Sequence, residues 1–281
     1  YSAEGNTVVG YQAGNNLSSG DNNTLLGRNA GDALTTGLQN VVIGSEACEV
    51  GTGIINYNVT IGYRANENSG SGHNYDSVAI GQGAGQFTAA EGNVIIGYNA
   101  QVSSLTGGFN TIIGKQAKVG STGSTGTNNL VLGYQAQSSA SNISNEITLG
   151  NSSITSLRCA VTSITSLSDE RDKSEIKDLE YGLAFIDALQ PREFVWDNRP
   201  ETKLIKDIEN GTETEVEFYS ANKGKKDFGF IAQEVRELDN DTLRLVYTEN
   251  EDKLEMSYGK LVPILVKAIQ ELKAEIELLK Q

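Results

Sequence analysis

The sequence predicts a mainly β repeat stalk, built as a trimeric parallel β-roll or β-helix, followed by an α+β domain that ends in a long coiled-coil helix. Three observations lead to this prediction. A motif with a period of about 17 residues recurs through the first part of the chain. Only five of the 31 glycines lie after residue 167. Near the C-terminus, apolar residues recur at alternating steps of three and four, the spacing of a coiled-coil seam.

The repeat is aligned on a glycine, which alanine follows three residues later in the first eight copies. Between an earlier asparagine and this glycine lies a β-prone triplet, for example Val41-Val42-Ile43. We therefore expect one short strand per repeat, ended by a sharp bend that glycine permits. The aligned glycines are Gly10, Gly27, Gly44, Gly62, Gly81, Gly97, Gly114, Gly133 and Gly150, and the asparagines are Asn6, Asn23, Asn40, Asn58, Asn93, Asn110 and Asn129.

A single repeat has too few apolar residues to form a core, so neighbouring repeats must stack. Stacking in register gives continuous apolar ladders and an asparagine ladder. The short period predicts a narrow two-sided roll. Because the triplets are apolar throughout, we expect one strand face inside the roll and the other against another chain, in a homotrimer or other oligomer.

The repeat closely resembles, at residues 77–84 (SVAIGQGA), the head repeats of trimeric autotransporter adhesins. This resemblance implies left-handed parallel β-rolls packed as a trimer. The same style of repeat is similar to repeats in phage tail fibres. The repeats offer no plausible catalytic constellation, so they predict architecture rather than function.

The composition argues against several classes of function. A net charge of -14 disfavours nucleic-acid binding and adhesion to anionic lipid. No apolar run approaches the ~18 residues of a membrane span, so we expect no membrane insertion. Cys48 and Cys159 lie far apart and the one histidine is His73, so we expect no disulfide framework, no metal and no cofactor.

Charge and glycine content place a domain boundary between a stalk at residues 1–167 and a second domain at residues 168–281. Nine acidic and five basic residues lie in the stalk, against 27 and 17 in the second domain. The periodicity of Leu179, Leu183, Ile186 and Leu189 predicts a helix that ends before Pro191. Further elements are predicted as strands at 194–196 and 215–219, a loop or hairpin insertion at 197–214, a strand at 228–231 leading into a helix at 232–238, and a β-hairpin of 243–247 with 254–258.

The last segment carries a heptad seam, with Pro263 near the start of the helix, where proline is tolerated. Such a helix either packs on its own domain or forms a coiled coil between chains. Strict alternation over six positions favours the coiled coil. The seam positions are Val262, Leu265, Ile269, Leu272, Ile276 and Leu279.

Motifs of the second domain, in order along the chain, resemble one known family. They are SDERDK at 168–173, LQP at 189–191, GFIAQEV at 229–235 and YGKLVPILVKAIQEL at 258–272. The family is the C-terminal intramolecular chaperone domain of endosialidases and of phage tail fibres and spikes, a self-cleaving serine peptidase. The resemblance implies that the domain helps a β-helical stalk to trimerise and then releases itself. It also implies that Ser168 is the nucleophile, Lys173 the general base, and the bond between Leu167 and Ser168 the cleavage site.

This chemistry sets conditions on the site. A lysine activates a serine only as the neutral amine, and free lysine has a pKa near 10.4. The four acidic residues at 169, 170, 172 and 175 favour the charged form. We therefore expect Lys173 to become competent when a packed trimer desolvates it.

Spacing adds a second condition. Residues five apart on a helix point about 140° apart, so the pair requires a turn or loop. Asp169 and Arg171 are candidate supporting residues, and Arg171 or backbone N–H groups could stabilise the oxyanion. The alternative for Ser168-Asp169 is a helix N-cap.

We interpret the chain as the C-terminal part of a homotrimeric phage tail fibre or appendage, assembled in the host cytoplasm and carried on the virion. Its terminal domain would act as a single-turnover autoprotease, and its stalk could meet a host cell-surface receptor, either a glycan or a protein. The alternative is a trimeric adhesin on a bacterial surface, with a stable C-terminal cap that does not cleave. A membrane-tethered transcription factor released by the same type of domain is disfavoured by the acidity and by the lack of a membrane span or basic module.

Overall fold

The structure is a computed structural model that describes residues 3–32, 34–50, 55–67, 74–120, 123–160, 166, 168–197, 199, 201–206, 213–218, 222–248 and 250–280. The chain forms two compact units. The first comprises residues 1–154 and 201–218, and the second comprises residues 155–200 and 219–281.

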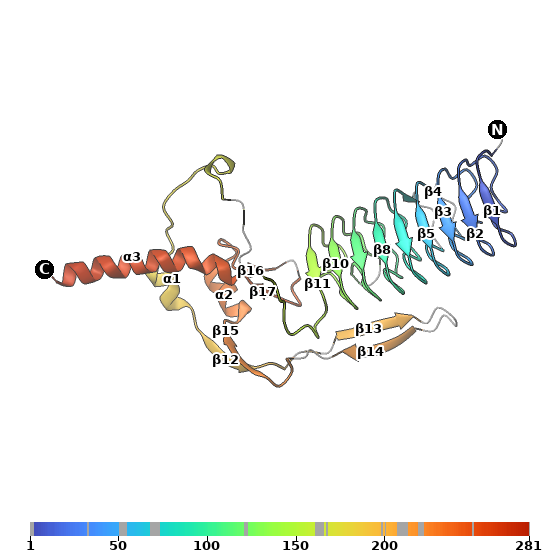
Figure 1. The fold of residues 1–281 in the computed structure, drawn as a ribbon. Helices are drawn as coiled ribbons and strands as arrows, with labels where there is room; N and C mark the ends of the chain where they lie inside the picture. The colour runs from blue at the N-terminus through green and yellow to red at the C-terminus, as the bar shows by residue number, and fades with distance from the viewer. Residues whose placement is uncertain are drawn as a thin grey trace. The chain divides into compact units, whose positions relative to one another are not determined.

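The first unit contains a parallel β-solenoid of about eight turns, which Figure 1 shows as a row of stacked coils. Among the described residues, nine short strands form one parallel sheet, and each strand pairs in register with that of the next coil. The predicted strand of each repeat is thereby confirmed. These strands are β1 (Thr7–Val9), β2 (Thr24–Leu26), β3 (Val41–Ile43), β5 (Val59–Ile61), β7 (Val78–Ile80), β8 (Val94–Ile96), β9 (Thr111–Ile113), β10 (Leu130–Leu132) and β11 (Ile147–Leu149).

The middle residue of most triplets points into the coil, because successive side chains of a strand face opposite sides. In β2, β3, β8, β9 and β10 this residue is buried, while its two neighbours are more exposed. The repeated alanine is fully buried at the corner, as at Ala47 and Ala100. The bend needs glycine: Gly44 has φ +135°, and a Cβ there would lie 2.5 Å from the carbonyl oxygen of Gly62.

An asparagine ladder runs through the interior. The backbone N–H of Asn40 donates to Asn23 Oδ1 at 2.9 Å, and that of Asn110 donates to Asn93 Oδ1 at 2.9 Å. Ser77 takes one place in the row. These bonds satisfy buried polar groups and hold the coils at one register.

The outer positions of the strands leave apolar side chains on the outside of the single chain. Val9, Leu26, Ile113 and Leu149, all at the third position of their triplets, are 38–56% exposed. A two-stranded parallel sheet of β4 (Ile55–Asn56) and β6 (Asn74–Tyr75) supplements the main one. The outward apolar row is the surface that the predicted contact between chains would use.

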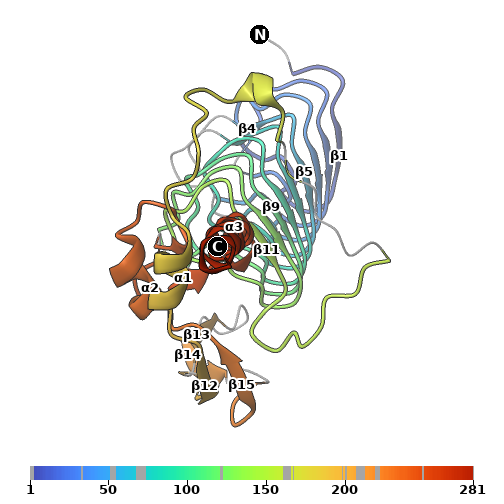
Figure 2. The ribbon, with the colours of Figure 1, turned by 90° about the vertical axis from the view of Figure 1, so that its left-hand side faces the viewer.

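The second unit is a small α+β fold with one apolar core. Its helices and strands frame a core that includes Phe185, Val235, Leu245 and Ile264. Figures 1 and 2 both show α1 beside α3, in agreement with the contacts between them. The elements are α1 (Leu183–Ala188), β12 (Arg192–Val195), β15 (Lys226–Gly229), α2 (Ala232–Asp239), β16 (Val246–Tyr247), β17 (Glu255–Met256) and α3 (Leu261–Leu279), with 3-10 turns at Glu170–Asp172 and Tyr258–Lys260.

The elements predicted for residues 168–281 exist, but several bounds differ. Strand β12 ends at Val195, before Trp196, and β15 ends at Gly229. The insertion predicted at 197–214 is part of an antiparallel hairpin of β13 (Glu201–Lys206) and β14 (Glu213–Phe218). The hairpin predicted from 243–247 and 254–258 pairs only at β16 and β17.

The helix predicted through Leu179 is too long. Helix α1 begins at Leu183, after Gly182, and Leu179 precedes it as a partly buried residue against the core. Glu271 of α3 explains the start, since its Oε2 accepts the backbone N–H of Leu183 at 2.7 Å. The first N–H groups of a helix have no acceptor within the helix, and a carboxylate at the N-terminus supplies one.

Helix α3 carries two apolar faces. Leu261, Ile264 and Ala268 are buried against their own unit. The six seam positions are exposed, from 41% at Leu272 to 87% at Leu279. One face of the helix thus packs on its own unit, as one alternative proposed. The other face is exposed, and the coiled coil between chains stays a prediction. In the described residues, no helix has the length and apolar character needed to cross a membrane.

Candidate active site

A tight turn carries the candidate site. Asp169 is the N-cap of the 3-10 turn Glu170–Asp172, and its side chain accepts the backbone N–H of Arg171 at 2.9 Å. Lys173 closes the turn by donating its backbone N–H to Glu170 at 3.1 Å, and then continues as extended chain. The N-cap alternative thus applies to Asp169 and not to Ser168.

The turn brings the two predicted site residues together. Lys173 Nζ lies 2.7 Å from Ser168 Oγ and 3.0 Å from the carbonyl oxygen of Ser168. The first distance is that of a nucleophile and a base in hydrogen-bond contact. Both side chains are exposed in the single chain. Leu167, on the other side of the predicted cleavage site, lies outside the described residues.

The predicted supporting residues bond to one another. Arg171 Nη2 lies 2.6 Å from Asp169 Oδ2, and Arg171 Nε lies 3.0 Å from Asp169 Oδ1. These bonds from the arginine side chain, with the backbone N–H of Arg171, hold the pKa of the Asp169 carboxyl below its ordinary value. Arg171 must exchange this partner before it can stabilise an oxyanion.

The remaining acidic neighbours leave the amine free for the serine. Glu170, Asp172 and Glu175 are exposed, and no ion pair between described residues involves Lys173. Both described hydrogen bonds of Lys173 Nζ go to Ser168. The amine is therefore turned toward the Ser168 hydroxyl, and both side chains stay exposed.

Contacts within the second unit join motifs that are distant in the sequence. Tyr258 Oη accepts the backbone N–H of Phe230 at 3.2 Å, and a Cβ on Gly229 would lie 2.6 Å from that oxygen. Arg192 and Glu234 form a two-bond ion pair at 3.0–3.1 Å. Gly229 and Tyr258 belong to separate motifs of the sequence, and nothing in the sequence indicated that they meet.

A second cluster of charges lies in the stalk and was not predicted. Single ligand atoms of Glu46, Glu49 and Glu67 lie within 4.8 Å of one another. Arg64 contacts Glu46 at 3.4 Å and Glu67 at 2.6 Å, and Arg28 bonds to Glu46. With two arginines among three carboxylates, we describe this cluster as an ion-pair network rather than a metal centre.

The comparison with protein families decides what the second part of the chain is. The family model described as the chaperone of endosialidase matches residues 168–244, starting at the serine of the candidate site. Residues 168–244 form an endosialidase-type chaperone domain. The family is one of peptidases, which indicates a self-cleaving domain. Searches among curated proteins and among solved structures gave no match.

The chaperone domain and the β-solenoid together fit a tail-fibre-like role in trimerisation and folding. The solenoid supplies the long repetitive part, and α3 of the second unit carries a row of exposed apolar side chains. The family match ends at Arg244, so α3 itself lies beyond it.

Proposed function

We propose that this chain is the C-terminal part of a homotrimeric phage tail fibre or appendage. Its chaperone domain holds three stalks in register while they fold, and then removes itself by cleaving between Leu167 and Ser168. The observation that carries the proposal is the 2.7 Å contact between Lys173 Nζ and Ser168 Oγ at the first residue of the family match.

The proposed reaction proceeds in two steps. Ser168 Oγ attacks the carbonyl carbon of Leu167, and Lys173 takes the hydroxyl proton. The amide nitrogen of Ser168 leaves with that proton, so that an ester joins Leu167 to Ser168 Oγ. Water then hydrolyses the ester, which gives a carboxylate at Leu167 and a free amine at Ser168.

Assembly is the proposed trigger. A lysine ammonium has no lone pair to accept a proton, so Lys173 acts as a base only as the neutral amine. Three chains joined through the α3 seam and the outer apolar row of the stalk would exclude water from the turn. Cleavage would then follow correct assembly and not precede it.

We place the mature trimer in a virion tail appendage, with the stalk toward a host surface receptor of glycan or protein nature. The rival is a bacterial surface adhesin whose cap never cleaves. The apolar outer row and the family match support a homotrimer in either case.

Mass spectrometry of the purified full chain tests the cleavage. We expect one fragment that ends at Leu167 and one that begins at Ser168, with the first fragment trimeric in native spectra. A trimer that keeps an intact chain after prolonged incubation would support the adhesin and contradict self-removal.

A further inference from the structure

The apolar core of the solenoid is interrupted near its middle. One buried cluster extends from Leu25 to Ile55, and another extends from Ala84 to Ala136. Between them, the strand centre is Thr60 in β5 and is the small Ala79 in β7. The centres of β2, β3, β8, β9 and β10 are leucine, valine or isoleucine.

The asparagine ladder changes at the same level. Ser77 stands where the neighbouring coils have Asn58 and Asn93, and its side chain is shorter than asparagine. The Asn93 N–H reaches Ser77 Oγ at 3.2 Å, compared with 2.9 Å from Asn110 N–H to Asn93 Oδ1. Two small residues, Ser77 and Ala79, thus leave space in one coil.

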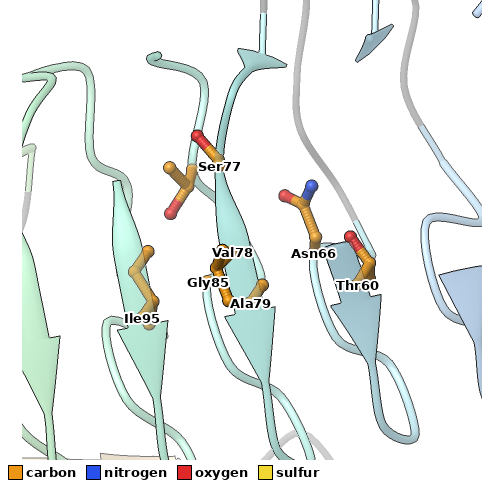
Figure 3. A pocket seen from close by; sticks show the side chains of 8 residues that line it. Thr60, Asn66, Ser77, Val78, Ala79, Gly85 and Ile95 are labelled. Carbon is orange, nitrogen blue, oxygen red and sulfur yellow. The ribbon is translucent and has the colours of Figure 1, made fainter. Parts of the chain in front are cut away.

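This space is a cavity of about 10 Å³ (Figure 3). Its lining comes from neighbouring coils and includes Thr60, Asn66, Ala79 and Ile95. No charged side chain is among the described lining residues. A cavity near 10–15 Å³ on this measure is about the smallest that holds one water molecule.

Two polar atoms of the wall have no hydrogen-bond partner among the described residues. They are Asn66 Oδ1 and Thr88 Oγ1, on side chains that are each 2% exposed. Buried polar groups are nearly always paired, with protein or with ordered water. A small neutral molecule that can both donate and accept would satisfy these two atoms.

We infer that the cavity binds one ordered water molecule, which donates to Asn66 Oδ1 and bonds to Thr88 Oγ1, with the hydroxyl of Thr60 as a further neighbour. A buried water typically has two to four polar partners, which this wall supplies. The absence of charge among the lining residues favours water over an ion. The water replaces the apolar side chain that other coils use at this level.

A thermal-unfolding cycle tests the inference. Ala79→Val puts the side chain of other coils into the cavity and expels the water. We expect the Tm to fall by about 3 °C, the order of shift for loss of one buried polar interaction in a chain of this size. The same change in an Asn66→Gly/Thr88→Val background should leave the Tm unchanged or raise it. Glycine suits position 66, because Gly31 and Gly85 occupy the corresponding place in other coils.

Two outcomes of the cycle contradict the water. A higher Tm in both backgrounds would mean that the cavity is dry, and an equal fall in both would mean overpacking alone. A crystal structure of the full chain gives an independent answer. Electron density within hydrogen-bond distance of Asn66 Oδ1 and Thr88 Oγ1 supports the water, whereas an empty cavity or a protein side chain at that place overturns it.

Discussion

Lys173 donates to two oxygen atoms of one residue, the hydroxyl and the backbone carbonyl of Ser168. The second bond holds the amine against the backbone next to the bond proposed to break. A lysine held at two points loses less rotamer freedom when the site closes. At the residue scale, the turn sets the geometry of the proposed dyad within a single chain.

Alanine at either site residue should abolish cleavage and leave the trimer assembled. Ser168→Ala removes the nucleophile and Lys173→Ala removes the base, and each should cost several orders of magnitude in rate because the two act as a unit. Neither side chain belongs to the core of the chaperone domain. Gel electrophoresis after expression is the measurement.

Ser174→Ala is the matched control for these variants, since Ser174 is an exposed serine in the same segment. It should cleave like the parent chain. Full cleavage by Lys173→Ala would show that lysine is not the base, and cleavage by Ser168→Ala would show that the site is misplaced.

Asp172→Ala tests the effect of the acidic neighbours. Removal of a nearby negative charge destabilises the ammonium form of Lys173, so cleavage near neutral pH should be unchanged or faster. Asp178→Ala removes an exposed carboxylate farther along the chain and serves as the control. A slower reaction in Asp172→Ala but not in Asp178→Ala would indicate that Asp172 supports catalysis directly.

The sequence led to Ser168 and Lys173 through a family resemblance, because a serine and a lysine five residues apart have no meaning alone. It also required a turn, which the cap at Asp169 supplies. It could not predict that Arg171 binds Asp169, since an exposed arginine has several carboxylates within reach in this segment. Such choices depend on side-chain geometry that no pattern encodes.

Helix α3 has one face in the core of its own unit and another face that is exposed. Its buried face belongs to the core of the second unit, and its seam is free to meet other chains. Because Glu271 of α3 also caps α1, the helix takes part in forming the fold from which its seam is presented. At the scale of elements, we therefore expect the seam to take its position when the second unit folds.

A charge in the seam should prevent assembly without unfolding the unit. Ile269→Asp would bury a carboxylate between helices and weaken association by at least about 2 kcal/mol per chain, the scale of losing a buried isoleucine. Gln270→Asp, at the next exposed position of the helix, is the control. Sedimentation should give monomer for Ile269→Asp and trimer for Gln270→Asp, and a trimeric Ile269→Asp would exclude the seam as the contact.

The strands of the stalk were predictable because the same triplet recurs, so that each copy supports the others. The second unit was harder, since its elements occur once. The strand expected at 243–247 is shortened because Leu243 and Leu245 donate their N–H groups to the buried Asp239 carboxylate, at 2.6 and 3.0 Å. These two bonds satisfy the backbone N–H groups in place of a partner strand, and only the folded chain places Asp239 there.

At the scale of the whole molecule, both parts of the chain expose apolar side chains. The stalk exposes an apolar row, and α3 exposes the six apolar positions of the predicted seam. Native mass spectrometry of the Ser168→Ala chain should therefore show a trimer at micromolar concentration. A stable monomer would contradict the assembly proposed for both parts.

Deletion of residues 168–281 should leave the stalk insoluble or out of register when it is expressed alone. The reason is that three stalks with identical repeats can pair at several offsets, and only a unique partner surface selects one of them. Solubility and native mass of the stalk fragment are the measurements. A soluble trimeric stalk made without the chaperone domain would show that its help is dispensable.

Among the described residues, each strand of the main sheet pairs with the strands of the adjacent coils, and the same positions meet at every step. Removal of residues 94–110 would join Asn93 to Thr111 and recreate an intact repeat. The length of such a stalk therefore changes in fixed steps. Adding or removing one repeat changes the length by about 4.8 Å, the spacing between neighbouring strands, and leaves the cross-section of the stalk the same.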